Sequence, residues 1–395
     1  MVTAINAHRD AVREWFGSNT EDVRCFFAPG RVNLIGEHLD YNGGRVLPAA
    51  LELGIWLFAR VRRDGRFRFA SMGFREQVEL EDGDLSYRSQ HGFANYPKGV
   101  LSVLQKEGIR LPGLDCFFYS SLPQGAGLSS SAAIEVVTGF AVSTLAGHRL
   151  TPQTLARFSQ QAENTYVGVQ CGIMDQFAVT AGARDSAVLL DCERLTFDYV
   201  PLKLGRYRLV IINSNKERQL SESRYNQRRE ECQEALNVLH GLDREVLSLA
   251  SLTPERWQVY RASFQSETLR RRVDHVVSEN ARVSEAVRLL RQGDLVGFGA
   301  LLNLSHQSLR DAFEVTGPEL DTLAEAAQEA PGSLGARMTG AGFGGCVVAL
   351  VEGERIPEFV DQVERQYRKT VGYAPSFYES ASGDGVREVT EEVAL

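Results

Sequence analysis

One segment of the sequence, residues 125–133, restricts the possible fold more than any other. It reads Gly-Ala-Gly-Leu-Ser-Ser-Ser-Ala-Ala and lies between a strand-like apolar segment at 114–120 and a long apolar segment with helical periodicity at 131–146. Glycines let the backbone approach a ligand closely, and the first turn of a helix exposes unpaired N–H groups with a partial positive charge. The segment therefore predicts a phosphate-binding helix N-terminus, although a glycine turn with an ordinary serine cap would have the same pattern.

A second segment, residues 30–41, concentrates polar side chains next to a short strand expected at 23–27. Glu37 and Asp40 can each accept hydrogen bonds from neighbouring hydroxyl groups, and Arg31 can stabilise developing negative charge. The segment predicts a site for a ligand rich in hydroxyl groups. An internal salt-bridge cluster that holds the loop is the alternative.

Two acidic residues lie on either side of a break between helices. Thr151 and Pro152 are typical of a helix start, and the helix is expected to run to about residue 167 with Glu163 on it. Asp175 follows the break, within Cys-Gly-Ile-Met-Asp-Gln. The two carboxylates could face one site, or they could be ordinary helix caps.

The rest of the pattern favours an α+β protein of two domains, residues 1–204 and 205–395, because helices and strands mix without a regular βαβ period. A charged helix after residue 221 is expected to end at Gly241. The other expected elements are an opening helix over 1–16, a buried strand over 46–61, a strand over 209–212, helices over 276–292 and 318–330, and a strand over 346–351.

The segment from Arg60 to Phe69 is predicted to form a hairpin, because Asp64-Gly65 at its centre is a strong turn signal. It carries five arginines, which could suggest a nucleic-acid patch. The whole chain has 43 Lys and Arg against 51 Asp and Glu, a net charge of −8, and this balance argues against nucleic-acid or anionic-membrane partners. We therefore expect the arginines to lie on an exposed face of the hairpin.

Composition also bears on location. The longest stretch without polar residues is 340–351, too short for a membrane span, and the first residues lack the apolar core of a secretory signal. The six cysteines are scattered, as in proteins of a reducing compartment. A cytoplasmic protein is expected, with a monomer as the default.

The run Gly340-Ala-Gly-Phe-Gly-Gly345 matches the glycine fingerprint of dinucleotide-binding folds. That fingerprint follows a strand and opens a helix, whereas these glycines precede the β-branched segment at 346–351. A dinucleotide site is therefore not expected, and the chain contains no P-loop sequence.

Taken together, these segments resemble the GHMP small-molecule kinases and, in their sugar-kinase branch, the galactokinases. The resemblance rests on GRVNLIGEHLDYNGG (30–44), LPQGAGLSSSAA (122–133) and RMTGAGFGGC (337–346). It is reinforced by CGIMDQF (171–177), INSNKERQLSESRYNQRRE (212–230) and HQSLRDAFEVTGPELDTL (306–323).

The resemblance implies a two-domain GHMP kinase fold with the active site in the cleft between the lobes. It also implies transfer of the γ-phosphate of ATP to the anomeric C1 hydroxyl of D-galactose, with Mg²⁺ as cofactor and sugar and ATP as the partners. The third motif would be a second glycine loop that closes over the site.

Residue roles follow from the same resemblance. Asp175 would be the catalytic base and Arg31 the stabiliser of the transition state, with Ser131 and Glu163 as Mg²⁺ ligands. The residues implied to cradle the ATP phosphates are Gly125, Ala126, Gly127, Leu128, Ser129, Ser130 and Ser131. Those implied to line the sugar site are Glu37, His38, Leu39, Asp40, Gly172 and Tyr225.

One position departs from the resemblance. The family's first motif usually reads Glu-His-Thr-Asp-Tyr, and this chain has Leu39 in place of the threonine. A leucine that faces the core would change nothing, whereas one that faces the ligand would favour a related sugar such as N-acetylgalactosamine or galacturonate. Tyr225 and the segment 171–176 look like the galactose type. A non-catalytic sugar sensor is a third alternative, which the intact serine loop disfavours.

Overall fold

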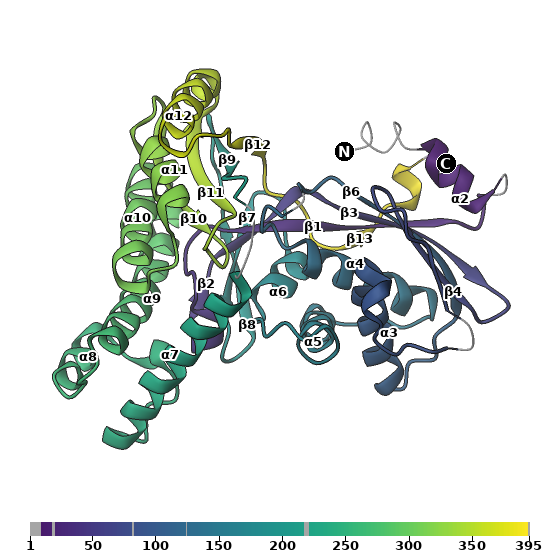
Figure 1. The fold of residues 1–395 in the computed structure, drawn as a ribbon, viewed down its shortest axis with the longest axis horizontal. Coiled ribbons are helices and arrows are strands. Elements are labelled where there is room, and N and C mark those ends of the chain that lie inside the picture. The colour runs from purple at the N-terminus through teal and green to yellow at the C-terminus, as the bar shows by residue number, and fades with distance from the viewer. Residues whose placement is uncertain (1–8, 18–19, 81–82, 124, 217–220, 394–395) are drawn as a thin grey trace.

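The computed structural model describes residues 9–17, 20–80, 83–123, 125–216 and 221–393. A six-stranded sheet forms one half of the elongated molecule (Figure 1). Its strand order is β13-β1-β3-β6-β4-β5, and its described neighbours pair antiparallel except for β4 and β6. The strands are β1 (Arg24–Asn33), β3 (Pro48–Arg62), β4 (Phe67–Ser71), β5 (Val78–Leu80), β6 (Gly113–Ser120) and β13 (Arg387–Glu388).

Strands β1 and β3 are buried on both faces. Phe26 pairs with Leu57 and Phe27 with Trp56, and successive side chains point to opposite faces of the sheet. Phe26 and Leu57 join the main core, and Phe27 and Trp56 join a second apolar cluster. The main core contains residues of α3 (Asn95–Lys106), α4 (Ser130–Leu145), α5 (Pro152–Ala162) and α6 (Met174–Ala181), and the second contains residues of α2 (Arg9–Phe16) and the end of the chain.

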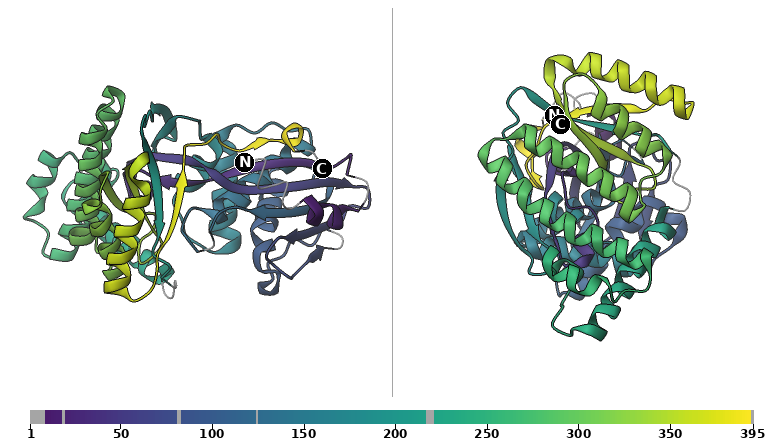
Figure 2. Two further views of the ribbon diagram at one scale, coloured as in Figure 1. Left: turned by 90° about the horizontal axis from the view of Figure 1, so that it is seen from above. Right: turned by 90° about the vertical axis from the view of Figure 1, so that its left-hand side faces the viewer.

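A second, four-stranded antiparallel sheet has the order β10-β11-β9-β12. Figure 2 shows the C-terminal helices, green to yellow, stacked at this end of the molecule. The strands are β9 (Tyr207–Asn213), β10 (Ser333–Thr339), β11 (Cys346–Glu352) and β12 (Ser376–Ser380). The helices are α7 (Ser221–Leu242), α8 (Pro254–Arg261), α9 (Glu267–Gln292), α10 (Leu295–Ser308), α11 (Pro318–Glu329) and α12 (Ile356–Val371).

A small sheet and the C-terminal strand complete the fold. The sheet contains β2 (Arg45–Val46), β7 (Ser186–Asp191) and β8 (Thr196–Pro201). Strand β13 pairs with β1, so the end of the chain returns to the first sheet. In the described part of the chain, no helix is both long and apolar enough to cross a membrane.

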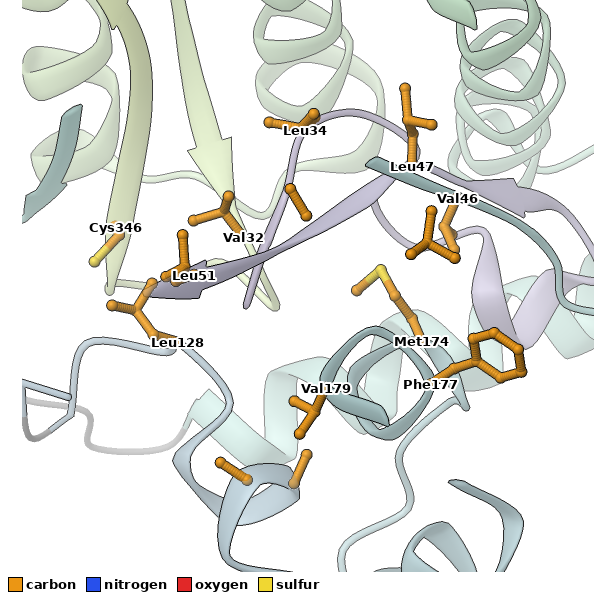
Figure 3. Packing of buried hydrophobic residues seen from close by; sticks show 14 of the residues in the cluster. Val32, Leu34, Val46, Leu47, Leu51, Leu128, Met174, Phe177, Val179 and Cys346 are labelled. Carbon is orange, nitrogen blue, oxygen red and sulfur yellow. The ribbon is translucent and has the colours of Figure 1, made fainter. Parts of the chain in front are cut away.

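The core beneath the glycine-serine loop contains apolar residues from both of the larger sheets. Figure 3 shows Leu128 of the loop beside Leu51 of β3 and Cys346 of β11. The thiol of Cys346 also donates a hydrogen bond to the carbonyl of Ala126, at 3.0 Å. The loop is therefore anchored by apolar packing on its inner side.

Several expected elements are confirmed. The strand expected at 114–120 is β6 and the helix expected at 131–146 is α4. The side chain of Thr151 caps α5 by accepting a hydrogen bond from the Thr154 N–H, and a single π-helical turn over Glu163–Val167 continues it to the expected end. The α+β class is confirmed as well. Within the expected opening helix, residues 1–8 lie outside the described part of the chain.

The hairpin expected at 60–69 is wrong. The chain does turn near Asp64 and Gly65, but β3 and β4 do not pair, because β6 lies between them and pairs with both. The sheet can admit β6 here because Gly113 has no side chain: a Cβ at that position would lie 2.7 Å from the carbonyl carbon of Gly65.

The arginines of this segment do not form a simple exposed face either. Arg60, Arg62 and Arg68 donate hydrogen bonds of 3.0, 2.7 and 2.7 Å to the carboxylate of Asp115, whose side chain is 3% exposed. Burial alone would raise the pKa of Asp115, but the three guanidinium groups hold it below its usual value. These residues therefore form a charge cluster around the buried Asp115 of β6, an interior strand of the sheet.

Two helix boundaries also differ from expectation. Helix α7 continues through Gly241 to Leu242, because Gly241 keeps a conformation open to any residue and does not adopt the left-handed one that ends a helix. Helix α9 begins at Glu267 instead of residue 276, where the side chain of Ser266 caps it by accepting a hydrogen bond from the Leu269 N–H at 3.3 Å. It ends as expected, before Gly293.

Candidate active site

A cavity of about 430 Å³ opens where the glycine-serine loop, the segment 37–40, the loop 168–172, helix α7 and the third glycine loop meet. It brings together most of the residues that the sequence singled out. Those that line it are Arg31, Glu37, His38, Asp40, Gly125, Gly127, Ser129, Ser130, Ser131, Glu163, Gly172, Asp175 and Tyr225.

Arg31 and Asp175 form a bidentate ion pair at the centre of this cavity. Nε of Arg31 donates to Oδ1 of Asp175 at 2.8 Å, and Nη2 donates to Oδ2 at 2.7 Å. Nη1 of Arg31 donates to the carbonyl of Gly127 at 2.9 Å, and the hydroxyl of Ser129 donates to Asp175 at 2.6 Å. The carboxylate is thus fixed in orientation from two sides, and a buried guanidinium joins it to the glycine-serine loop.

The glycine-serine loop leaves the start of α4 open to a ligand. Gly125, Gly127 and Ser129 all have positive φ angles, of 68°, 75° and 61°, which turn the chain sharply into the helix. The side chain of Ser129 makes no capping hydrogen bond to the helix, because its hydroxyl is used on Asp175. The first-turn N–H groups of α4 therefore remain available to an anion.

Glu163 lies behind the start of α4, in contact with Ser131. Burial raises the pKa of Glu163, and a hydrogen bond with the Ser131 side chain opposes that rise. Nε2 of Gln176 donates to Glu163 at 2.6 Å. A further carboxyl, Glu135, is buried beside them, and burial raises its pKa well above the usual value. A cation would offset the cost of burying this negative charge.

Hydroxyl and carboxylate oxygens are the ligands that Mg²⁺ prefers, and this ion usually takes few ligands from the protein. Ser131 and Glu163 fit that donor set. Within the described residues there is no cluster of three or more His, Cys, Asp or Glu side chains that could hold a metal by themselves.

Asp40 and Gly172 form one wall of the cavity. A Cβ at position 172 would overlap the carboxylate of Asp40, so any larger residue would force either this carboxylate or the loop 168–172 to move. Burial raises the pKa of Asp40 to about 6, and the charge of Asp175 adds to that rise. Asp40 is therefore a hydrogen-bonding group at the cavity whose position is coupled to the loop that passes beside it.

Aromatic rings form another wall. The ring of His38 lies 5.8 Å from that of Tyr225 on α7, and Nδ1 of His38 is 2.9 Å from the hydroxyl of Tyr41. Burial lowers the pKa of His38 to about 3, so its imidazole is neutral at physiological pH. This wall offers ring faces and neutral polar atoms, as a sugar ring requires.

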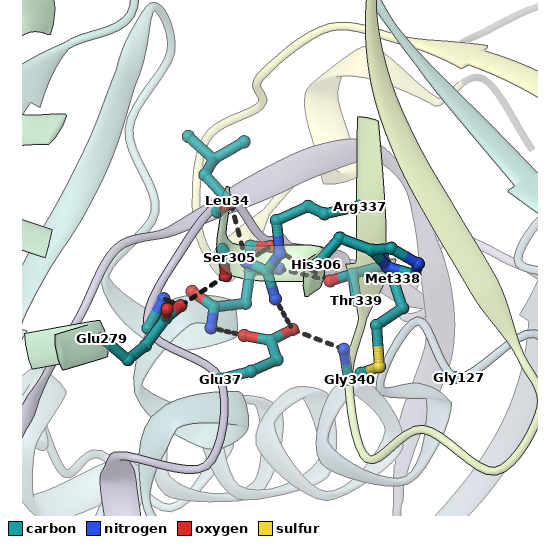
Figure 4. A network of polar contacts seen from close by, with 12 residues as sticks. Leu34, Glu37, Gly127, Glu279, Ser305, His306, Arg337, Met338, Thr339 and Gly340 are labelled. Carbon is teal, nitrogen blue, oxygen red and sulfur yellow. Dashed lines mark hydrogen bonds and ion pairs between the residues drawn. The ribbon is translucent and has the colours of Figure 1, made fainter. Parts of the chain in front are cut away.

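Glu37 is 1% exposed yet borders the cavity. Its carboxylate accepts hydrogen bonds from the Gly340 N–H, at 2.5 Å, and from the Asn33 side chain, and it pairs with Arg337 at 3.1 Å (Figure 4). Burial raises the pKa of Glu37 to about 7, and Arg337 opposes that rise. The first and third sequence motifs thus meet at one carboxylate.

Three residues implied for the site do not border the cavity. Leu39 is fully buried in the hydrophobic core, and Ala126 and Leu128 are buried under the loop. The expectation that Leu39 lines the sugar pocket is therefore wrong: of the two orientations considered for it, the structure has the one that faces the core. The loop presents its glycines and serines to the cavity and its apolar residues to the core.

Other cavity residues carried no prediction. Tyr96, Cys171 and Asn226 line it. Cys171 and Asn226 lie inside segments that carry the family resemblance, whereas Tyr96 lies outside all of them. Glu135, one turn beyond Ser131, and Gln176, next to Asp175, support Glu163 from behind. The closeness of Glu135 and Gln176 to the motifs was a usable signal. Sequence spacing does not show, however, that a side chain is buried behind the residues that line the cavity.

Comparisons with known proteins agree with this geometry. The chain matches the family model of the galactokinase galactose-binding signature over residues 13–61. It also matches those of the GHMP kinases N terminal domain over 95–183 and the GHMP kinases C terminal domain over 286–369.

Galactokinases of Exiguobacterium sibiricum and Halalkalibacterium halodurans are 48% and 47% identical to this chain over 93% of its length, and the alignments cover 94% and 93% of the relatives. A crystal structure of Lactococcus lactis galactokinase complexed with galactose is 40% identical and has a TM-score of 0.94, covering 98% of this chain and 100% of that one. Mevalonate kinase of Methanococcus jannaschii, 17% identical with a TM-score of 0.66 over 91% of this chain and 98% of that one, shares the fold.

Proposed function

The chain belongs to the galactokinases of the GHMP kinase family, and on that premise we propose which of its residues bind the two substrates and carry out the transfer. The enzyme transfers the γ-phosphate of ATP to the C1 hydroxyl of D-galactose, giving galactose 1-phosphate and ADP. The single observation that carries the assignment of roles is the Arg31–Asp175 pair, hydrogen-bonded to the glycine-serine loop on one side and open to the cavity on the other.

The ATP phosphates bind at residues 125–131, against the first turn of α4. The positive φ angles of the loop and the uncapped helix start support this assignment, because N–H groups and the helix dipole both favour an anion there. Ser131 and Glu163 would hold Mg²⁺, which when bound neutralises charge on the phosphates.

Galactose binds on the side of the cavity formed by Glu37, His38, Asp40, Gly172 and Tyr225. The two carboxylates accept hydrogen bonds from neighbouring hydroxyl groups, and the rings of His38 and Tyr225 pack against the apolar face of the sugar. The galactose complex of the Lactococcus lactis relative supports the choice of sugar.

Asp175 accepts a hydrogen bond from the C1 hydroxyl and orients it toward the phosphate. Enzymatic phosphoryl transfer has a loose transition state, so the hydroxyl keeps its proton until late in the reaction. A carboxylate is a weak base, and a weak base suffices for a late proton transfer. Arg31 places its positive charge between Asp175 and the loop, where negative charge develops on the transferred group.

The proposal also covers the domain division, the oligomeric state and the cellular compartment. We place the domain division at residues 204 and 205, in the connection between β8 and β9. We propose a monomer that works in the cytoplasm, in keeping with six cysteines that all lie in the described part of the chain as free thiols.

The proposal is tested by replacing Asp175. Asp175→Asn removes the negative charge and the basic oxygen that face the C1 hydroxyl, and Asp175→Ala removes the acceptor altogether. Each should lower kcat for galactose phosphorylation by a factor of about 10³ or more. ATP affinity, measured by calorimetric titration, should stay within a few-fold of the wild type. Asp361→Asn, on the exposed face of α12, is the matched control. Near-normal turnover in both Asp175 variants would refute the role.

A further inference from the structure

Arg337 is a fully buried arginine that the roles above do not use. It lies on β10, in the second sheet, and its side chain reaches the first motif (Figure 4). Nη1 donates to the carbonyl of Leu34 at 2.7 Å and is 3.4 Å from the carbonyl of Asn33. Nη2 lies 3.1 Å from Oε1 of Glu37. One guanidinium therefore contacts both the backbone and a side chain of the sugar-site segment.

Glu37 is held by three groups from two distant parts of the sequence. Oε1 accepts the Gly340 N–H at 2.5 Å and faces Arg337, while Oε2 accepts a hydrogen bond from the amide of Asn33. Gly340 follows directly on β10 and begins the third glycine loop, which also lines the cavity. The position of this carboxylate thus depends on where β10 holds Arg337 and Gly340.

We propose that Arg337 is a positioning residue for the sugar-binding step: it fixes the Glu37 carboxylate at the galactose side of the cavity without touching either substrate. This inference rests on the proposed role of Glu37 in galactose binding. Its consequence is that a change at Arg337 weakens galactose binding far more than ATP binding or the chemical step.

The chemistry of the site explains why arginine is needed here. The planar guanidinium can donate to a backbone carbonyl and pair with a carboxylate at the same time, whereas an ammonium group is a compact point charge on a flexible stem. A lysine at position 337 would keep the charge but lose one of the two contacts. The pair is also completely desolvated, so removing one partner leaves the other as an uncompensated buried charge.

A double-mutant cycle tests the inference. Arg337→Lys should raise KM for galactose at least tenfold, change KM for ATP less than threefold, and leave kcat at saturating galactose within fivefold of the wild type. Glu37→Gln should itself raise KM for galactose. In the Glu37→Gln background, Arg337→Lys should raise KM for galactose less than threefold further, because its effect passes through Glu37.

The control separates positioning from loss of stability. Asp115→Asn breaks a different buried ion cluster, remote from the cavity, and should destabilise the protein without changing KM for galactose. If Arg337→Lys does not fold, Arg337→Gln replaces it in the same cycle, since it leaves no buried cation to pair.

Three outcomes would overturn the inference. Additive effects in the cycle would show that Arg337 acts independently of Glu37, and an equal rise of KM for ATP would show a general disturbance of the cleft. Either result leaves the proposed sugar site standing. An unchanged KM for galactose in Glu37→Gln alone would instead refute the role of Glu37 as well.

Discussion

Gly172 shows how a single residue without a side chain determines the position of a functional one. The loop 168–172 passes so close to Asp40 that any Cβ would overlap its carboxylate. The φ angle of Gly172 is not among the positive ones, so close approach and not conformational freedom is what requires glycine here. A substitution at this position therefore acts on Asp40.

We expect Gly172→Ala to raise KM for galactose about tenfold, corresponding to about 1.4 kcal/mol of lost binding free energy. The added methyl group must displace Asp40 or the loop. Steady-state kinetics with varied galactose at saturating ATP measures the effect. Gly241→Ala is the control, because Gly241 lies in helix α7 with nothing within 4 Å of its would-be Cβ. An unchanged KM in Gly172→Ala would contradict the expectation that the close approach of this loop fixes Asp40 for sugar binding.

The two sugar-site carboxyls also predict a proton release. Burial raises the pKa of Asp40 to about 6 and that of Glu37 to about 7 in the empty site. Hydrogen bonds from sugar hydroxyl groups favour the ionised form and lower both pKa values on binding. Galactose binding should therefore release protons near pH 6, and its affinity should rise with pH between about 5 and 7.

Calorimetric titration of galactose at pH 6, in buffers of different ionisation enthalpy, measures the number of protons exchanged. Release of a fraction of a proton per site, falling toward zero above pH 8, is the expected result. Proton uptake, or an affinity independent of pH, would contradict the assignment of these carboxyls to the sugar.

At the scale of elements, the helices and strands that were predicted correctly are those whose bounds depend on residues close in sequence. The cap at Thr151 and the periodicity of α4 depend on neighbours within a few residues. Helix α10 was not predicted because two glycines interrupt its pattern. One of them, Gly299, is needed where the helix packs onto β10, since a Cβ there would overlap the carbonyl of Leu334.

Strand pairing was not predictable in the same way. The turn at Asp64-Gly65 favours a hairpin, yet β6, some forty residues further along the chain, enters between the two strands. What draws β6 in is non-local: its apolar residues join the main core, and its Asp115 accepts hydrogen bonds from three arginines of β3 and β4. Neither interaction can be inferred from the residues near the turn.

Asp115→Asn should therefore destabilise the fold by about 2 kcal/mol, because it leaves three guanidinium groups without their shared anion. The expected loss is below the ~3–5 kcal/mol of fully buried pairs, since the arginine side chains are 19–30% exposed and can turn toward water. Urea unfolding of the variant and the wild type gives the difference. A midpoint within error of the wild type would show that the cluster adds nothing to stability.

For the whole molecule, the candidate site was predictable in outline because most of its chemistry lies in three contiguous motifs. The cavity forms only when β10 and helix α7 of the second half meet the first sheet's loops. Arg337 lies inside a recognised motif, but its reach to Glu37 depends on how the two sheets are placed. Glu135 and Gln176 were missed for the same reason, since each acts through Glu163.

The net charge of the chain is opposite in sign to the charge that an ATP-binding site needs. The chain carries a net charge of −8, yet one of its substrates, ATP, is an anion. Positive potential must therefore be concentrated locally, and Arg31 and the open start of α4 lie side by side at the cavity. The net charge excluded classes of partner, whereas the local charge supports the reaction.

The central claim is that this cavity phosphorylates galactose at C1, and an ADP-release assay over a panel of sugars tests it most directly. Because Leu39 is buried in the core, the departure at this position leaves the pocket unaltered. We predict ADP release with galactose well above that with N-acetylgalactosamine or galacturonate, with galactose 1-phosphate as the product by phosphorus NMR. Equal or faster release with either modified sugar, or none with any sugar, would contradict the account.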